Sequence, residues 1–259
     1  MLAVVAEIST LTSNQVLDLL WNRNPAEKCS ISLADAIVYE NDCLPRWYMT
    51  GKTGEVLKKR EIDRDELSRR WLGISAQNDS PYVALLRHNN GTTKFVSTAT
   101  WYEIISGNAL EDQTLMSMHC FVRGSNNLAY RSNYTIKDRQ GRCAILTQSY
   151  SMSAESNDNG VTDLLTERNV NLTESKATAI NSVINLATST VVRYLERTRR
   201  IRIVSLSIDY VIDRKSQLWM LWTGSARIVR DTALFDCVVS GLVEGTIPKI
   251  KMMAIRESF

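Results

Sequence analysis

Residues 201–222 constrain the fold of this chain more than any other segment, because they have the pattern of two buried strands joined by a short polar turn. Apolar, mostly β-branched residues dominate from Ile203 to Ile212, residues 213–217 supply turn-forming side chains, and residues 218–222 form a second apolar run. A connection this short joins antiparallel strands. The segment predicts a buried β-hairpin with one acidic residue, Asp209, inside its first strand.

A long helix is predicted directly before this hairpin. Asn171 with Glu174 resembles a capping box, and apolar residues from Ala177 to Leu195 recur at helical spacing. Three strands joined by short polar turns are predicted before the helix, at residues 115–123, 128–136 and 143–152. We therefore expect an α+β fold with an antiparallel sheet meander, one long packing helix and a C-terminal β-hairpin.

The chain is expected to form two lobes, an N-terminal α+β lobe at residues 1–108 and a C-terminal α+β lobe at residues 109–259. In the first lobe, Thr12 or Ser13 is a candidate cap of a short helix. An Asn-Gly turn after residue 88 predicts a further hairpin.

Charge and cysteine usage limit the possible partners and compartments. The chain has 31 basic and 28 acidic residues and a formal net charge of +3, which gives no general reason to expect nucleic acid. Basic residues from Lys58 to Arg70 alternate with acids, so we expect them to pair with each other along a helix. Five widely spaced cysteines without a Cys-x-x-Cys pair are typical of reduced thiols. We expect a cytoplasmic protein that lacks a signal peptide and a membrane span.

The meander, the helix and the hairpin together resemble the C-terminal half of the ATP-grasp fold, and within it the tubulin-tyrosine-ligase-like enzymes, over residues 115–225. The resemblance lies in the sequences Ile208 to Asp213 and Leu218 to Leu221. Family members hold Mg²⁺ and ATP phosphates with an acid on the first strand, and with an acid and an asparagine two residues apart on the second. Asp209 matches the first acid, whereas Trp222 and Gly224 stand at the other two positions. The resemblance therefore implies a degenerate, non-catalytic member, because one carboxylate is too few ligands for a hard cation.

These patterns predict a non-catalytic structural or protein-interaction component without a cofactor. The candidate residues for binding an acidic protein partner are Arg193, Arg197, Arg199, Arg200, Arg202 and Trp222. Because Trp219 and Trp222 are three apart on one strand, we expect them to face opposite ways. The resemblance to tubulin ligases implies a cytoskeletal partner, as in a microtubule or a ciliary axoneme.

Other interpretations remain open. An ATP- and Mg²⁺-dependent ligase or kinase of the ATP-grasp type would use Asp209 as a metal ligand. An RNA-binding module would use the arginine cluster. In an ordinary α+β domain, Asp209 would bond a backbone amide or a nearby arginine, and the arginines would complement the helix dipole. The two histidines, His88 and His119, lie in or beside predicted strands and have structural roles by default.

Overall fold

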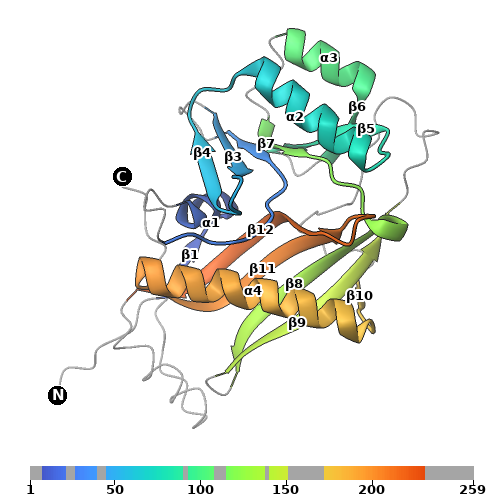
Figure 1. The fold of residues 1–259 in the computed structure, drawn as a ribbon. Helices are drawn as coiled ribbons and strands as arrows, with labels where there is room; N and C mark the ends of the chain where they lie inside the picture. Colours follow the sequence, from blue (N-terminus) through green and yellow to red (C-terminus); the bar gives the residue numbers. More distant parts are fainter. Residues whose placement is uncertain are drawn as a thin grey trace, which may run out of the picture.

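The described residues form two antiparallel sheets of six strands each (Figure 1). The structure is a computed structural model that describes residues 8–21, 27–39, 45–89, 93–107, 115–137, 140–150 and 172–230. The expected α+β fold, with its antiparallel sheet, long helix and C-terminal hairpin, is confirmed. The expected lobe boundary at residue 108 lies outside the described residues.

The first sheet, sheet A, contains the predicted hairpin. Its strands in spatial order are β1 (Ile8–Leu11), β12 (Leu218–Val229), β11 (Arg202–Ile212), β8 (Leu128–Lys137), β9 (Gln140–Ser149) and β10 (Thr173–Glu174). Asp209 lies opposite Trp222, whereas Tyr210 lies opposite Met220, so Leu221 is an extra residue in β12. Such a bulge reverses the alternation of side chains. It places Trp219 and Trp222 on the same face of the sheet, and the expectation of opposite faces is wrong.

A single long helix, α4 (Thr178–Arg199), covers one face of sheet A (Figure 1). Its buried stripe includes Ile184, Val191 and Leu195 at helical spacing, as the sequence pattern predicts. The helix begins after Ala177, which makes no capping bond with its side chain. The predicted capping box does not form there, because Glu174 lies in β10. Asn171, the other residue of that prediction, lies outside the described residues. Among the described helices, none is long and apolar enough to cross a membrane.

Polar side chains orient α4 on the sheet. The buried Thr188 hydroxyl donates to Ser132 Oγ at 2.9 Å and lies 3.1 Å from the Tyr210 hydroxyl. Ser132 and Tyr210 belong to β8 and β11, so both strands direct these residues toward the helix. Residues next to them in sequence, including Asp209 and Arg131, must point to the other face.

The second sheet, sheet B, carries two shorter helices on its outer face (Figure 1). Its strands in spatial order are β4 (Val56–Lys59), β3 (Arg46–Thr50), β2 (Ala36–Val38), β7 (Leu115–Cys120), β5 (Tyr82–His88) and β6 (Thr93–Ser97), and its helices are α2 (Arg64–Gln77) and α3 (Thr98–Ser106). Trp71 of α2 and Trp101 of α3 are fully buried and stack with ring centroids 5.0 Å apart. The β5–β6 hairpin is present as predicted. β7, in contrast, does not continue the meander of β8 and β9 but pairs with β2 and β5.

The chain between α1 (Ser13–Leu20) and β2 ties the two sheets together. The predicted cap of α1 is present, since Thr12 forms a capping box with Gln15.

Before β2, the Ala34 amide donates to the Met220 carbonyl at 2.8 Å, and the Met220 amide donates to the Ser32 carbonyl at 2.7 Å. Sheet A is thereby bonded through β12 to the segment that enters sheet B.

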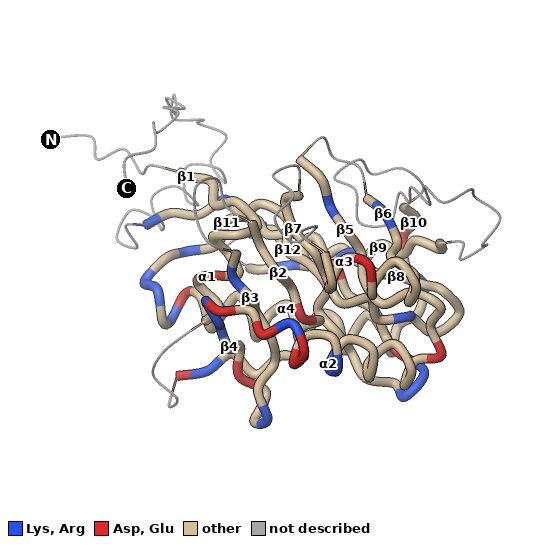
Figure 2. The backbone as a smooth tube through the Cα atoms, turned by 90° about the horizontal axis from the view of Figure 1, so that it is seen from above, with Lys and Arg blue, Asp and Glu red and all other residues tan. Residues whose placement is uncertain are grey.

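Two lysines end β4, and acidic and basic residues follow one another from there to the start of α2 (Figure 2). Their ion pairs join different elements rather than following one helix as expected. Lys58 of β4 pairs with Asp18 of α1 at 2.6 Å. Arg70 of α2 binds both oxygens of Asp35, whose side chain is fully buried. These charges therefore fix how α1 and α2 lie against sheet B.

Removal of the Asp35 carboxylate tests this role. We expect Asp35→Ala to lower the free energy of unfolding by about 3 kcal/mol, because it leaves the Arg70 guanidinium and the Trp71 indole N–H without their buried acceptor. Urea denaturation followed by circular dichroism measures the loss. Glu66→Gln, which removes the charge of the exposed pair with Lys59, is the control and should cost less than about 1 kcal/mol. Equal losses in both variants would contradict the assignment.

Candidate functional site

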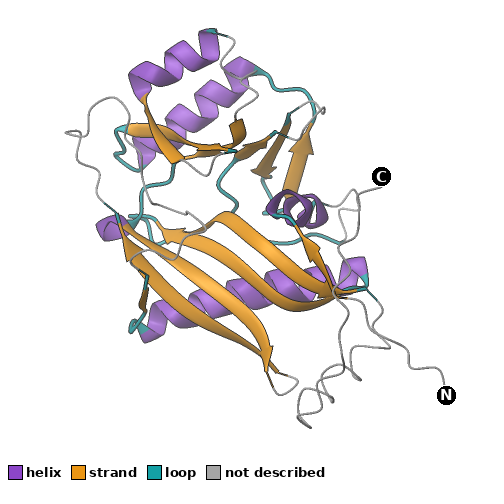
Figure 3. Cartoon of the chain, turned by 180° about the vertical axis from the view of Figure 1, so that it is seen from behind, coloured by secondary structure: helices purple, strands orange, loops and turns teal. Residues whose placement is uncertain are grey.

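An ion pair between neighbouring strands stands at the centre of the sheet A face that α4 leaves uncovered. In Figure 3 sheet A lies in front of α4, so this face is turned toward the viewer. Asp209 of β11 lies directly opposite Arg131 of β8. Arg131 Nε donates to Asp209 Oδ1 at 2.7 Å and Nη2 donates to Oδ2 at 3.0 Å. The side chains are 12% and 5% exposed, so this is a nearly buried, two-pronged charge pair.

Polar side chains continue from this pair along the same face. Ser207 precedes Asp209 by two residues, and its hydroxyl donates to Asn133 Oδ1 at 2.6 Å. Asn133 follows Arg131 by two residues, so all four side chains share one face. We call Arg131, Asn133, Ser207 and Asp209 the polar strip. A strip of this kind is suited to hydrogen bonding with a polar ligand rather than to packing against another layer.

Sheet B closes one end of the polar strip. Trp222, the neighbour of Asp209 on β12, is 3% exposed. The ring of His119 from β7 meets it edge to face with centroids 4.6 Å apart, and the guanidinium carbon of Arg87 from β5 lies 4.7 Å from its ring centroid. Both arrangements are favourable for an indole ring. Trp222 is therefore the contact through which the two sheets meet beside Asp209.

His119 is held in its neutral form at this contact. His119 is buried, and its Nε2 lies 2.9 Å from Ser117 Oγ. Burial, and secondarily the positive charge of Arg87, lower the pKa of His119 from 6.5 to about 3. Deep burial also raises the pKa of Cys120. Neither group is suited to proton transfer or nucleophilic attack near neutral pH.

The residues around Asp209 do not fit Mg²⁺. Both oxygens of Asp209 accept from Arg131, Trp222 offers no oxygen, and a Cβ at Gly224 would lie 3.2 Å from Ser207 Cβ, which leaves little room for a longer ligand. Throughout the described part of the chain, no three His, Cys, Asp or Glu side chains gather in a way that could hold a metal ion. Asp209 thus bonds an arginine, as one of the open interpretations has it, but this arginine lies 78 positions away in the sequence rather than nearby.

The arginines predicted to bind a partner do not form one surface. Arg193 and Arg197 are exposed on α4, and Arg200 is the exposed residue after the helix, with a left-handed φ of 51°. Arg199 instead donates to the Leu19 carbonyl through Nε at 3.0 Å, and Arg202 donates to Glu196 at 3.2 Å. Partner binding by these residues stays a prediction, as does partner binding by Trp222.

Arg131 and Arg87 are the site residues that sequence patterns did not identify. Each is a single cation within a predicted strand. Burial of a cation in a strand costs free energy unless an acidic or aromatic partner compensates it. An arginine in a predicted buried strand therefore indicates such a partner.

Comparison with known proteins finds likeness in structure only. No family model matches the chain, and no curated protein matches it in sequence. The D-alanine-D-alanine ligase from Coxiella burnetii is 7% identical with a TM-score of 0.43, and covers 82% of this chain and 46% of its own. The L-amino acid ligase from Bacillus licheniformis is 10% identical with a TM-score of 0.41, and covers 82% of this chain and 39% of its own. The carboxyaminoimidazole ribonucleotide synthase from Aspergillus clavatus, solved with ATP, is 12% identical with a TM-score of 0.39, and covers 82% of this chain and 44% of its own.

These findings bear on two predictions. The chain resembles ATP-grasp ligases in structure, at low sequence identity, as the sequence indicated. The prediction of a non-catalytic structural component with a cytoskeletal partner is contradicted by these comparisons, in which the three similar structures described above are two ligases and a synthase. The chain spans less than half of the length of each of the three proteins described above.

The neutral state of His119 predicts a specific acid sensitivity. Its pKa is depressed in the folded protein, so between pH 6.5 and about 3 the unfolded chain binds one more proton, and stability falls as the pH falls. Because of His119, the free energy of unfolding should fall by about 2 kcal/mol between about pH 7 and pH 5. In His119→Gln this contribution to the fall should be absent. Urea denaturation of both proteins across this range measures the difference. Parallel pH profiles would show that His119 is not held neutral.

Proposed function

We propose that this chain binds an adenine nucleotide, ATP or ADP, on the polar strip, as part of an ATP-dependent ligase or kinase. The observation that carries the proposal is the strip itself. Arg131, Asn133 and Ser207 gather on a sheet face that α4 does not cover, beside the place where the second sheet meets the first. Hydroxyl, amide and guanidinium groups are donors for phosphate oxygens.

Arginine, rather than a metal ion, supplies the positive charge in this proposal. A guanidinium group binds phosphate with two parallel hydrogen bonds, which is the geometry that Arg131 already uses with Asp209. Arg87 adds a second cation at the Trp222 end of the strip. Phosphoryl-transfer catalysis rests largely on positioning and charge stabilisation, so such cations are suited to that chemistry.

The comparisons support the choice of nucleotide but not a substrate. Two of the similar structures, both synthases, were solved with ADP and ATP respectively, and others are amino acid ligases. Mg²⁺ is not part of the proposal, because the described residues around Asp209 do not fit it.

Asp209 provides the test, because its charge opposes a phosphate and also occupies Arg131. Parental protein should be stabilised by ATP in the presence of EDTA. Asp209→Asn should bind ATP roughly tenfold more tightly, since the carboxylate that repels phosphate and competes with it for Arg131 is neutralised. The double variant Asp209→Asn/Arg131→Gln, which keeps a neutral pair, should lose this gain. Thermal shift and isothermal titration calorimetry with ATP measure both effects.

Arg197→Gln is the matched control, because it removes an exposed cation from α4, on the other face of sheet A. It should leave ATP binding unchanged. Absence of stabilisation by ATP or ADP, with or without Mg²⁺, would refute the proposed function. Stabilisation that requires Mg²⁺ and disappears in Asp209→Asn would instead show that Asp209 is a metal ligand, and would refute the arrangement through Arg131.

A further inference from the structure

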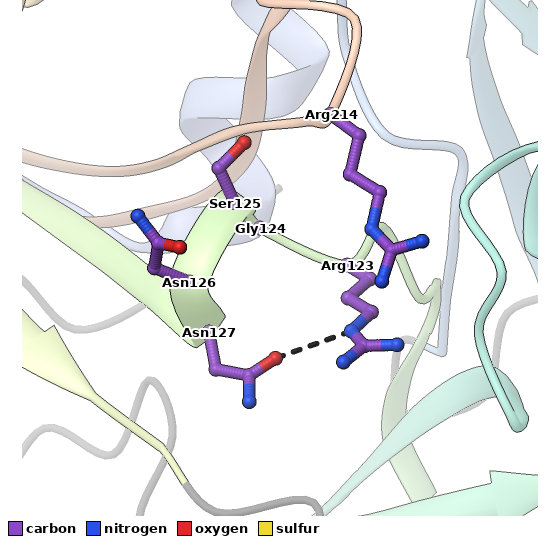
Figure 4. A pocket seen from close by; sticks show the side chains of 6 residues that line it. All are labelled: Arg123, Gly124, Ser125, Asn126, Asn127 and Arg214. Carbon is purple, nitrogen blue, oxygen red and sulfur yellow. Dashed lines mark hydrogen bonds between the residues drawn. The ribbon is translucent and has the colours of Figure 1, made fainter.

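A polar pocket lies away from the polar strip, where three separate parts of the chain meet. It has a volume of about 510 Å³ and is lined by the β7–β8 connection and by the turn between β11 and β12. Figure 4 shows the guanidinium groups of Arg123 and Arg214 on one side of it, with Ser125 and Asn126 across from them. The third part is the segment that follows α2, in which Asp79 accepts hydrogen bonds from both arginines.

Positive charge dominates this pocket. Arg214 pairs with Asp79 at 3.0 Å, but that carboxylate is 80% exposed, so the pair is weak and screened by water. The other nearby acid, Asp213, uses its oxygens within its own turn, where Oδ1 accepts from the Lys215 amide at 2.8 Å and Oδ2 accepts from Trp219 Nε1 at 3.0 Å. Two arginines therefore face the pocket against one exposed carboxylate.

The guanidinium group of Arg123 is held in place with donors to spare. Its Nε donates to Asn127 Oδ1 at 3.2 Å, and its Nη1 donates to the Asp79 carbonyl at 2.9 Å. Within the described residues these bonds occupy Nε and Nη1, and the Nη2 hydrogens are available to a ligand. Because the arginine is already oriented, a ligand loses less side-chain entropy when it binds there.

The opposite wall is equally constrained. Asn126 and Asn127 adopt left-handed φ angles of 57° and 53°. A Cβ at Gly124 would lie 2.4 Å from the Leu128 carbonyl oxygen, so only glycine fits, and its amide donates to the Tyr150 hydroxyl at 2.8 Å. Ser125 Oγ donates to the Asp213 carbonyl at 2.9 Å, which joins the connection to the β11–β12 turn. The pocket is thus a fixed feature of the fold.

We propose that this pocket is a binding site for a small phosphate-bearing molecule without a nucleobase. Paired guanidinium groups recognise phosphate, and the volume lies in the range of pockets for small-molecule ligands. Among the described residues that line it, none has an aromatic ring on which a base could stack. The site differs from the polar strip in its residues, so it goes beyond the proposed nucleotide function.

Pyrophosphate, which lacks a base and a sugar, is the probe for the test. Isothermal titration at constant ionic strength should detect pyrophosphate binding to the parental protein at millimolar concentration. Arg214→Gln, a change at a half-exposed turn residue, should weaken it roughly tenfold, and Arg123→Gln/Arg214→Gln should abolish it. The control Arg193→Gln/Arg197→Gln removes two exposed arginines from α4 and should bind as the parental protein does.

Absence of binding to the parental protein would overturn the proposal, and so would an equal loss of affinity in the control. Unchanged affinity in Arg214→Gln, with circular dichroism confirming the fold, would also overturn it. Asp209→Asn should leave pyrophosphate affinity at the Arg123–Arg214 pocket unchanged. The variants at residues 123 and 214 should likewise leave ATP binding to the polar strip unchanged, so failure of one site is distinguishable from failure of the other.

Discussion

The ion pair between Arg131 and Asp209 determines what the centre of sheet A can do. An acid at this depth needs compensation, and a metal ion or a cation can supply it. Here the compensation comes from the strand next to it, in direct register, through two hydrogen bonds. The sheet therefore needs no bound ion to be stable. A ligand with negative charge has to compete with Asp209 for Arg131, so Asp209 lowers the affinity of the strip for such a ligand.

Trp222, the neighbour of Asp209 on β12, offers no oxygen ligand for a metal ion. At its position a second carboxylate would lie beside Asp209, in a place shielded from water by His119 and Arg87. Two carboxylates so close would repel each other at high cost unless a cation separated them. An indole ring removes that repulsion and contributes edge and face contacts to the second sheet. The indole at this position therefore offers no metal ligand and adds a contact between the sheets.

The sequence patterns predicted local elements well and predicted relations between distant elements poorly. The hairpin around Asp209, the stripe of α4 and the cap at Thr12 follow from periods and caps within a few residues. Arg131 is 78 positions from Asp209, and no local pattern can pair them. The bulge at Leu221 and the transfer of β7 into sheet B depend on which strands become neighbours. The sequence therefore identified Asp209 as an acid in a buried strand. It did not identify Arg131 as the partner that prevents Asp209 from acting as a metal ligand.

The two groups of arginines differ in how their charge is balanced, and this difference separates their roles. Arg131 faces a buried carboxylate, so a phosphate gains its bonds only by breaking a strong pair. Arg123 and Arg214 have one exposed carboxylate between them, and much of the attraction to it is lost to water. A phosphate at the Arg123–Arg214 pocket adds bonds and displaces little. On electrostatic grounds, the pocket at the β7–β8 connection therefore binds a small anion at lower cost than the polar strip does.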